Sequence, residues 1–265
     1  MPDPLQKEFQ KELEVGRAAA KRAGEIALSY YRHGIGFEAK ADLSPVTAAD
    51  RECERAVASL LEEAFPDDGL LGEEGAAKPS RSGRRWIIDP IDGTRDFVRG
   101  STAWAVLIGL EAGNDIVAGF AFLPAIGDLF CAARGHGAFC NDEPIRVSSV
   151  TSPSDAVLCL NGFNSAARLP FASRLLDWIE PFWAVRSMGG CLDAVMVARG
   201  QADLWIEPSG KPWDFAPLKI LIEEAGGRFF DFQGGNTIYG GNCVLCTPGL
   251  EAVARAFVSG AAAAQ

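Results

Sequence analysis

The sequence predicts a protein of mixed α and β structure in two halves, which differ in how helices and strands follow one another. Residues 1–150 begin with helical periodicity and continue as alternating apolar strands joined by tight turns, typical of helices on an antiparallel sheet. Residues 151–265 alternate strands with helical stretches, the rhythm of an α/β sheet. No linker rich in Pro, Gly or Ser separates the halves. We therefore predict one compact α+β/α/β unit with a ligand cleft between the halves.

The composition restricts the class of protein. Of the 265 residues, 48% are hydrophobic and 23% are charged, as in an ordinary globular enzyme. A net charge of -10 without long runs of Lys and Arg argues against nucleic acid as a partner. The 7 scattered cysteines indicate reduced thiols and a cytoplasmic protein. The charged N-terminal segment has no apolar core of the kind a signal peptide carries, and no apolar run reaches the ~18 residues of a membrane span, so we expect no signal peptide and no membrane partner.

In the first half, apolar spacing predicts helices over residues 5–32 and 47–65. Thr47 is a suitable N-cap for the second helix, and Asp50, three residues on, completes a capping box. The strands predicted after these helices are 70–72, 86–88, 103–111, 116–123 and 128–133, with a turn expected at Pro90.

In the second half, we expect helices and strands to alternate. Trp183 and Trp205 are expected in the core, and Cys243 and Cys246 are expected as small buried residues of a strand rather than a redox or zinc pair. The predicted strands lie near 155–160, 182–186, 202–207, 227–231 and 243–246, and the predicted helices near 166–178, 190–199, 213–225 and 249–259.

Three short motifs place carboxylates at or near the ends of apolar elements. They are GEE at 72–74, DPIDGT at 89–94 and PWD at 212–214. Close carboxylates repel one another, so a cation is expected between them. With only 2 histidines in the chain, zinc is disfavoured, and oxygen ligands favour Mg²⁺ or Mn²⁺. The candidate ligands are Glu73, Asp89, Asp92 and Asp214.

Gly93 and Thr94, which follow Asp92, open the next segment of the chain. If that segment is a helix, their N–H groups form an anion site. Metal ions beside such groups are typical of phosphoryl chemistry, in which two ions stabilise the attacking and leaving oxygens. Taken alone, the acids of GEE could be a solvated turn and Asp214 a helix cap. The three motifs in this order predict a metal-dependent phosphatase.

Together these motifs closely resemble the inositol monophosphatase family of Mg²⁺-dependent phosphatases. The stretches WIIDPIDGT at 86–94 and PWDFAPL at 212–218, with EEAGG at 223–227, carry the resemblance. It extends to SPVTAAD at 44–50 and GAFCNDEPIRVS at 137–148, and so covers nearly the whole chain. The resemblance implies a layered α-β-α-β-α sandwich, two to three Mg²⁺ ions and a homodimer.

The resemblance also implies roles for individual residues. Glu73, Asp89 and the Ile91 carbonyl would hold one ion, and Asp89, Asp92 and Asp214 a second, with a third, weaker ion near Glu73. By the same resemblance, Asp50, Glu73 and Thr94 would orient and activate the attacking water. The N–H groups of Gly93 and Thr94 would hold the phosphate, and Lys40 would lie near the metals. The residues in contact with the substrate would be Asp92, Gly190 and Glu207.

Two branches of the family compete for the substrate, a small phosphate monoester. RDFVRG at 95–100 and WAVLIGLE at 104–111 resemble histidinol-phosphatases. That branch carries Asp where Gly190 stands, and GCLD at 190–193 is more similar to enzymes of inositol phosphates. Arg95-Asp96 departs from the commoner Thr-Asn or Lys-Ser. A bisphosphatase for a sugar or nucleotide 3′-phosphate, and a regulatory protein-binding member, remain as alternatives.

Overall fold

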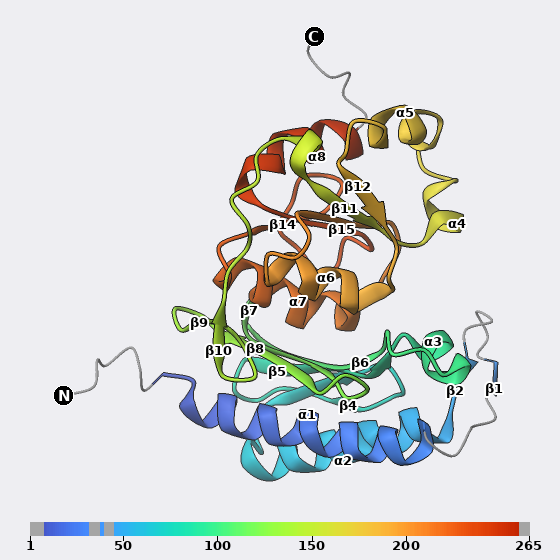
Figure 1. Ribbon diagram of the computed structural model, residues 1–265. Coiled ribbons are helices and arrows are strands. Elements are labelled where there is room, and N and C mark those ends of the chain that lie inside the picture. Colours follow the sequence, from blue (N-terminus) through green and yellow to red (C-terminus); the bar gives the residue numbers. More distant parts are fainter. Residues whose placement is uncertain (1–7, 32–37, 40–44, 260–265) are drawn as a thin grey trace.

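The computed structural model describes residues 8–31, 38–39 and 45–259, and these residues form five stacked layers (Figure 1). Two long helices cover the outer face of a first sheet, two more lie between this sheet and a second one, and the last helix covers the far side. The α-β-α-β-α sandwich implied by the resemblance is therefore confirmed. The helices are α1 Gln10–Tyr31, α2 Ala48–Ala64, α3 Thr94–Arg99, α4 Phe163–Ala166, α5 Leu175–Ile179, α6 Gly190–Ala198, α7 Pro212–Glu224 and α8 Glu251–Val258.

The first sheet contains eight strands within the described residues, in the order β10-β9-β8-β7-β6-β5-β3-β4. Its pairs are antiparallel except β3 and β5, which run parallel. The strands are β3 Gly69–Gly72, β4 Ala77–Lys78, β5 Arg84–Asp92, β6 Ala105–Ala112, β7 Asp115–Leu123, β8 Asp128–Ala133, β9 Gly137–Cys140 and β10 Glu143–Ile145. A separate short pair joins β1 Glu38–Ala39 to β2 Pro45–Val46.

The second sheet has the order β12-β11-β13-β15-β14 in the described chain. Strand β11 runs parallel to both of its neighbours, whereas β15 is antiparallel to β13 and β14. The carboxyl ends of β11 and β13 therefore meet at one edge of the sheet. The strands are β11 Val157–Leu160, β12 Ala184–Arg186, β13 Leu204–Glu207, β14 Arg228–Phe230 and β15 Cys243–Cys246.

The two faces of the first sheet bury different cores. Alternate residues of β5 divide between them: Trp86 and Ile88 pack toward α1 and α2, and Ile87 packs toward α6 and α7. Strand β15 does the same in the second sheet, with Cys243 and Cys246 on opposite faces. All seven cysteines are buried and free, so Cys243 and Cys246 are confirmed as buried strand residues.

Strand β5 is longer than predicted and corrects the expected turn at Pro90. It runs through to Asp92, and its pairing with β6 shifts between Asp89 and Asp92. Asp89 pairs with Leu107 and Asp92 with Ala105, so three steps along β5 match two along β6. Residues three apart in a regular strand point to opposite faces. The extra residue of the bulge brings both carboxylates to the same face, the one that α7 covers.

Several local predictions were wrong. The predicted helix near 166–178 is broken into α4, a 3₁₀ turn Ala172–Arg174 and α5, since Pro170 cannot continue a helix. Trp183 is 72% exposed, although Trp205 is buried as expected. The hairpin of β9 and β10 was missed because its strands are short. The start of the first predicted helix and Lys40 lie outside the described residues. In the described chain, no helix combines the length and apolar character needed to cross a bilayer.

Candidate metal centre

Three carboxylates from distant parts of the chain meet at one end of the first sheet. Each of Asp89, Asp92 and Asp214 offers an oxygen, and these oxygens lie within 4.8 Å of one another. All three line a cavity of about 240 Å³. The other residues lining this cavity are Glu73, Ile91, Gly93, Thr94, Arg95 and Asp96. The structure thus brings the acids of all three sequence motifs together.

The pairing of strands explains how Glu73 reaches the cavity. Because β3 and β5 are parallel, with Gly72 opposite Ile88, the ends of both strands lie side by side. The Glu73 N–H donates to the Ile88 carbonyl at 3.1 Å, which places Glu73 beside Asp89.

Asp214 arrives from the opposite side, in the first turn of α7. Its Oδ2 accepts the backbone N–H of Lys211 at 2.8 Å, as in one half of a capping box. Asp214 therefore caps its helix and faces the cavity at the same time. The sequence left open whether Asp214 is a helix cap or a candidate metal ligand, and its position allows both.

The pKa values of these acids are raised by burial and by one another. Burial raises the pKa of Asp89 well above its usual range, and the charges of Glu73, Asp92 and Asp214 raise it further. Burial and the neighbouring Asp92 raise the pKa of Asp214 to about 7. Burial also raises the pKa of Asp92, although the Cys191 N–H counteracts this. Such a cluster stores repulsion that a cation would relieve.

The donor set fits a hard divalent cation. Among the described residues, no Lys or Arg forms an ion pair with Asp89, Asp92 or Asp214. Each of these carboxylates accepts one backbone N–H, from Ile91, Cys191 and Lys211 respectively. The other oxygens of these three carboxylates have no Lys or Arg partner among the described residues. Carboxylate oxygens are the ligands that Mg²⁺ and Mn²⁺ prefer.

Helix α3 begins at Thr94, so the segment after Asp92 is a helix, the condition that the sequence left open, and Gly93 is its N-cap. Gly93 has a left-handed φ of +81°, and a Cβ there would lie 2.6 Å from the Ala103 carbonyl oxygen, so only glycine fits. The Thr94 hydroxyl donates to the Ile91 carbonyl at 3.1 Å. The expected phosphate-binding residues therefore adjoin the expected metal ligands.

Asp50 lies beside this cavity but does not line it. It is 1% exposed, and its Oδ2 accepts both the N–H and the hydroxyl of Thr47, at 2.8 and 2.6 Å. The predicted capping box of α2 is confirmed. Burial raises the pKa of Asp50 to about 6, and the charges of Glu74 and Glu73 contribute to the increase.

The residues expected to contact the substrate are the last residue of β5, Asp92, the first of α6, Gly190, and the last of β13, Glu207. The Cys191 N–H donates to Asp92 Oδ2 at 3.1 Å, and a Cβ on Gly190 would lie 2.9 Å from the same oxygen. Glu207 ends β13, and burial raises its pKa to about 8, with contributions from the nearby charges of Asp92 and Asp214. Gly190 and Glu207 are thus both close to the acidic cluster.

Comparisons with known proteins agree with this geometry. Residues 8–261 match the profile described as "Inositol monophosphatase family". The chain belongs to the inositol monophosphatase family. A histidinol-phosphatase of Chlorobaculum parvum is 38% identical over 87% of this chain and 89% of its own. An inositol-1-monophosphatase of Rhizobium meliloti is 34% identical over 93% and 91%. A solved structure of the extragenic suppressor protein suhB from Bartonella henselae superposes with a TM-score of 0.86 and 30% identity, covering 94% and 99%.

Members of the inositol monophosphatase family are metal-dependent, typically with Mg²⁺. This chain is accordingly a phosphoric monoester hydrolase that acts on a small phosphorylated alcohol. The two branches suggested by the sequence, histidinol-phosphatase and inositol-1-monophosphatase, both occur among its relatives.

The sequence did not identify two buried polar residues that contact the loop of residues 187–189 before α6. Asn161 follows β11 directly, and its buried amide nitrogen has no hydrogen-bond partner within the described chain. Asp193 is fully buried and accepts the N–H groups of Met188 and Gly189 at 3.1 and 3.3 Å, which fixes the loop before α6. A polar residue at the end of an apolar strand was the available signal for Asn161.

Proposed function

We propose that two or three Mg²⁺ ions, replaceable by Mn²⁺, are held by Glu73, the Ile91 carbonyl and the carboxylates of Asp89, Asp92 and Asp214. The observation that carries this proposal is the group of three carboxylates whose oxygens lie within 4.8 Å of one another in a cavity that Glu73 also lines. Bound there, Mg²⁺ supplies charge stabilisation at the phosphate and lowers the pKa of water.

The protein's own groups orient the reactants. The N–H groups of Gly93 and Thr94 bind phosphate oxygens, and the Thr94 hydroxyl, Glu73 and Asp50 orient and activate the attacking water. The pKa of about 6 at Asp50 supports this role, because such a carboxylate is ionised near neutral pH and still accepts a proton readily. The proposal therefore gives α2 a catalytic residue as well as a structural role.

The leading candidate substrate is an amino-alcohol phosphate such as histidinol phosphate. Two acids outside the metal set support it: Asp96 lines the cavity, and Glu207 lies close to Asp92 and Asp214. A cationic amine would find a carboxylate partner there. Asp193 cannot replace the branch's missing Asp, since its oxygens are occupied by the loop before α6.

Inositol monophosphate is the second candidate. Gly190 has no room for a larger side chain without moving Asp92, which favours a branch that does not use an acid at this position. A bisphosphatase is less well supported, because a second phosphate needs cations. Arg95 is the one basic side chain among the described residues that line the cavity.

Phosphate release from a substrate panel, with and without Mg²⁺, tests this proposal. The panel contains histidinol phosphate, inositol 1-phosphate, glycerol 2-phosphate, fructose 1,6-bisphosphate and adenosine 3′,5′-bisphosphate. We expect a clear preference for histidinol phosphate that is lost on chelation, and no turnover by Asp92→Asn. Preference for inositol 1-phosphate would select the second candidate. No release by the folded, Mg²⁺-loaded protein would contradict the catalytic proposal and favour a regulatory role.

Two further proposals concern the cell and the assembly. The resemblance supports a homodimer, which light scattering of the purified protein tests directly. The free cysteines are consistent with a cytoplasmic protein. Fractionation of the source cells would test this location.

A further inference from the structure

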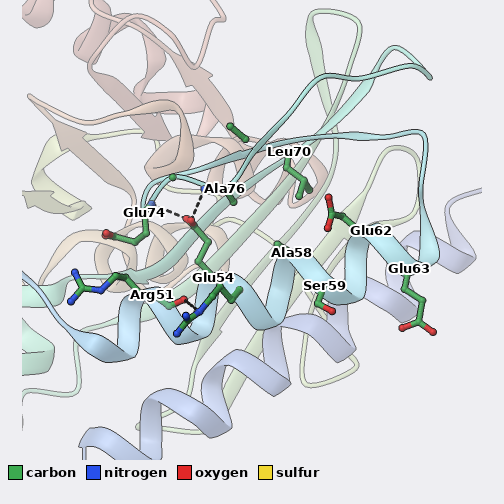
Figure 2. Close-up of a pocket in the computed structure, with 12 residues that line it drawn as sticks. Arg51, Glu54, Ala58, Ser59, Glu62, Glu63, Leu70, Glu74 and Ala76 are labelled. Atoms are coloured by element: carbon green, nitrogen blue, oxygen red, sulfur yellow. Dashed lines mark hydrogen bonds between the residues drawn. The ribbon is translucent and has the colours of Figure 1, made fainter.

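Glu54 of α2 lies directly beneath the turn that carries Glu73. Its side chain is buried, with 4% of the residue exposed, and it points from the helix toward the turn (Figure 2). One carboxylate oxygen accepts the Glu74 N–H at 2.8 Å and the other accepts the Ala76 N–H at 2.7 Å. Both bonds are drawn in Figure 2. Among the described residues, Glu54 forms no ion pair with Lys or Arg.

Gly72, at the end of β3, makes this contact possible. A Cβ on Gly72 would lie 2.2 Å from Glu54 Oε2, closer than any real contact. The Gly72 N–H donates to the Ala76 carbonyl at 2.7 Å, and the Glu73 N–H donates to the Ile88 carbonyl at 3.1 Å. The backbone on both sides of Glu73 is therefore fixed, by β5 on one side and by Glu54 on the other.

Glu54 also relates this turn to Asp50, which precedes it by one helical turn on the same helix. The charges of Glu73 and Glu74 act on Asp50, so the two proposed functional groups are neighbours. Helix α2 thus holds the turn through Glu54 and also carries Asp50.

We propose that Glu54 is a positioning residue of the metal centre: its carboxylate holds the turn of residues 73–76 so that Glu73 faces the ion. This inference rests on the proposed function, in which Glu73 is a metal ligand. A carboxylate accepts both N–H groups at once, whereas an amide has one acceptor oxygen and would turn its NH₂ toward the second N–H. Glu54→Gln therefore releases one side of the turn while preserving volume.

The test is a titration of the metal-free protein with Mn²⁺ in which electron paramagnetic resonance detects the free ion. This experiment measures metal affinity without turnover. We expect Glu54→Gln to weaken Mn²⁺ binding roughly 10- to 100-fold, the usual effect of losing a group that orients a ligand. The Mg²⁺ concentration for half-maximal turnover should rise in parallel, and excess Mg²⁺ should restore most of kcat. Gly72→Ala should weaken binding similarly, because its Cβ displaces the same carboxylate.

Two controls make the outcome decisive. Glu63→Gln changes an exposed glutamate of the same helix and should leave Mn²⁺ affinity unchanged. Glu73→Gln should weaken binding strongly; if it does not, the ligand assignment fails and the positioning role fails with it. If Glu73→Gln weakens binding but Glu54→Gln only lowers the melting temperature at unchanged Mn²⁺ affinity, Glu54 is structural and the inference alone is overturned. Should Glu54→Gln not fold, Glu54→Asp, whose shorter side chain cannot reach both N–H groups, takes its place with the same expected loss.

Discussion

Gly109 and Gly119 face each other across strands β6 and β7, and helix α7 lies directly on both. A Cβ on Gly109 would lie 2.7 Å from the Ala216 Cβ, and one on Gly119 would lie 2.8 Å from the Pro217 backbone. Without side chains at these two positions, the helix approaches the sheet closely. This approach brings Asp214, in the first turn of α7, into contact distance of the carboxylates on β5.

Gly119→Ala should therefore disturb the metal centre from a distance. The added methyl group must push α7 away from the sheet, so we expect the free energy of unfolding to fall by about 1–3 kcal/mol. We also expect weaker Mn²⁺ binding, because Asp214 moves with the helix. Denaturant unfolding and Mn²⁺ titration measure the two effects.

Gly16→Ala is the matched control for this prediction. A Cβ on Gly16 would lie 2.2 Å from the Phe120 ring, on the opposite face of the same strand β7. This variant should lose stability while keeping its Mn²⁺ affinity. Equal loss of affinity in both variants would show that general loosening, rather than displacement of α7, is responsible.

The stability of the metal-free protein should depend on pH in an unusual direction. Unfolded acids have a pKa of roughly 4. In the folded protein the pKa values of Asp89 and Asp92 are raised, that of Asp214 is raised to about 7, and that of Glu207 is raised to about 8. The folded state then binds more protons than the unfolded state between these values. Its stability is therefore greatest toward the acidic side and is lost as pH rises through the folded pKa values.

Melting temperatures of chelator-treated protein between pH 5.5 and 8 measure this dependence. We expect the melting temperature to fall as pH rises, and Mg²⁺ to raise it most at pH 8, where fewer protons must be displaced. Asp214→Asn should flatten the curve. A melting temperature that is independent of pH in the wild type would refute the raised pKa values.

Glu207→Gln should separate substrate recognition from metal binding. The substitution removes the carboxylate near Asp92 and Asp214 but none of the proposed metal ligands. KM for histidinol phosphate should rise roughly 10- to 100-fold, the loss expected for a charged hydrogen bond of about 1.5–3 kcal/mol. The Mg²⁺ concentration for half-maximal turnover should stay unchanged. A smaller effect on inositol 1-phosphate would indicate that Glu207 pairs with the amine, whereas a shifted Mg²⁺ requirement would place Glu207 among the metal ligands.

Thr47→Ala should affect both the stability of α2 and the action of Asp50. Loss of the N-cap hydroxyl costs about 1 kcal/mol in typical helices. The hydrogen bond from the Thr47 hydroxyl lowers the pKa of Asp50, so its loss should raise this pKa and move the acidic limb of kcat/KM to higher pH, although the backbone N–H of residue 47 still donates to Asp50. Thr47→Ser, which keeps the hydroxyl, should behave as the wild type. An unchanged pH profile in Thr47→Ala would argue against Asp50 as the group that accepts the proton.

Local sequence patterns were enough to predict much of this protein. The capping box of Thr47 and Asp50 and most strands of the first sheet depend on neighbouring residues, and the structure confirms them. The residues of the acidic cluster were also recognisable, because each carboxylate lies at or near the end of an apolar element.

Only the tertiary structure decided which way these groups face. The bulge in β5 that puts Asp89 and Asp92 on one face depends on pairing with β6, and the close approach of α7 depends on glycines of two other strands. The contact of Glu54 with the turn after β3 likewise joins segments that are separate in sequence. The amino-acid sequence by itself determined which ligands are available and where α2 begins. Register and packing decided their geometry, since the direction of a side chain depends on partners that local spacing does not reveal.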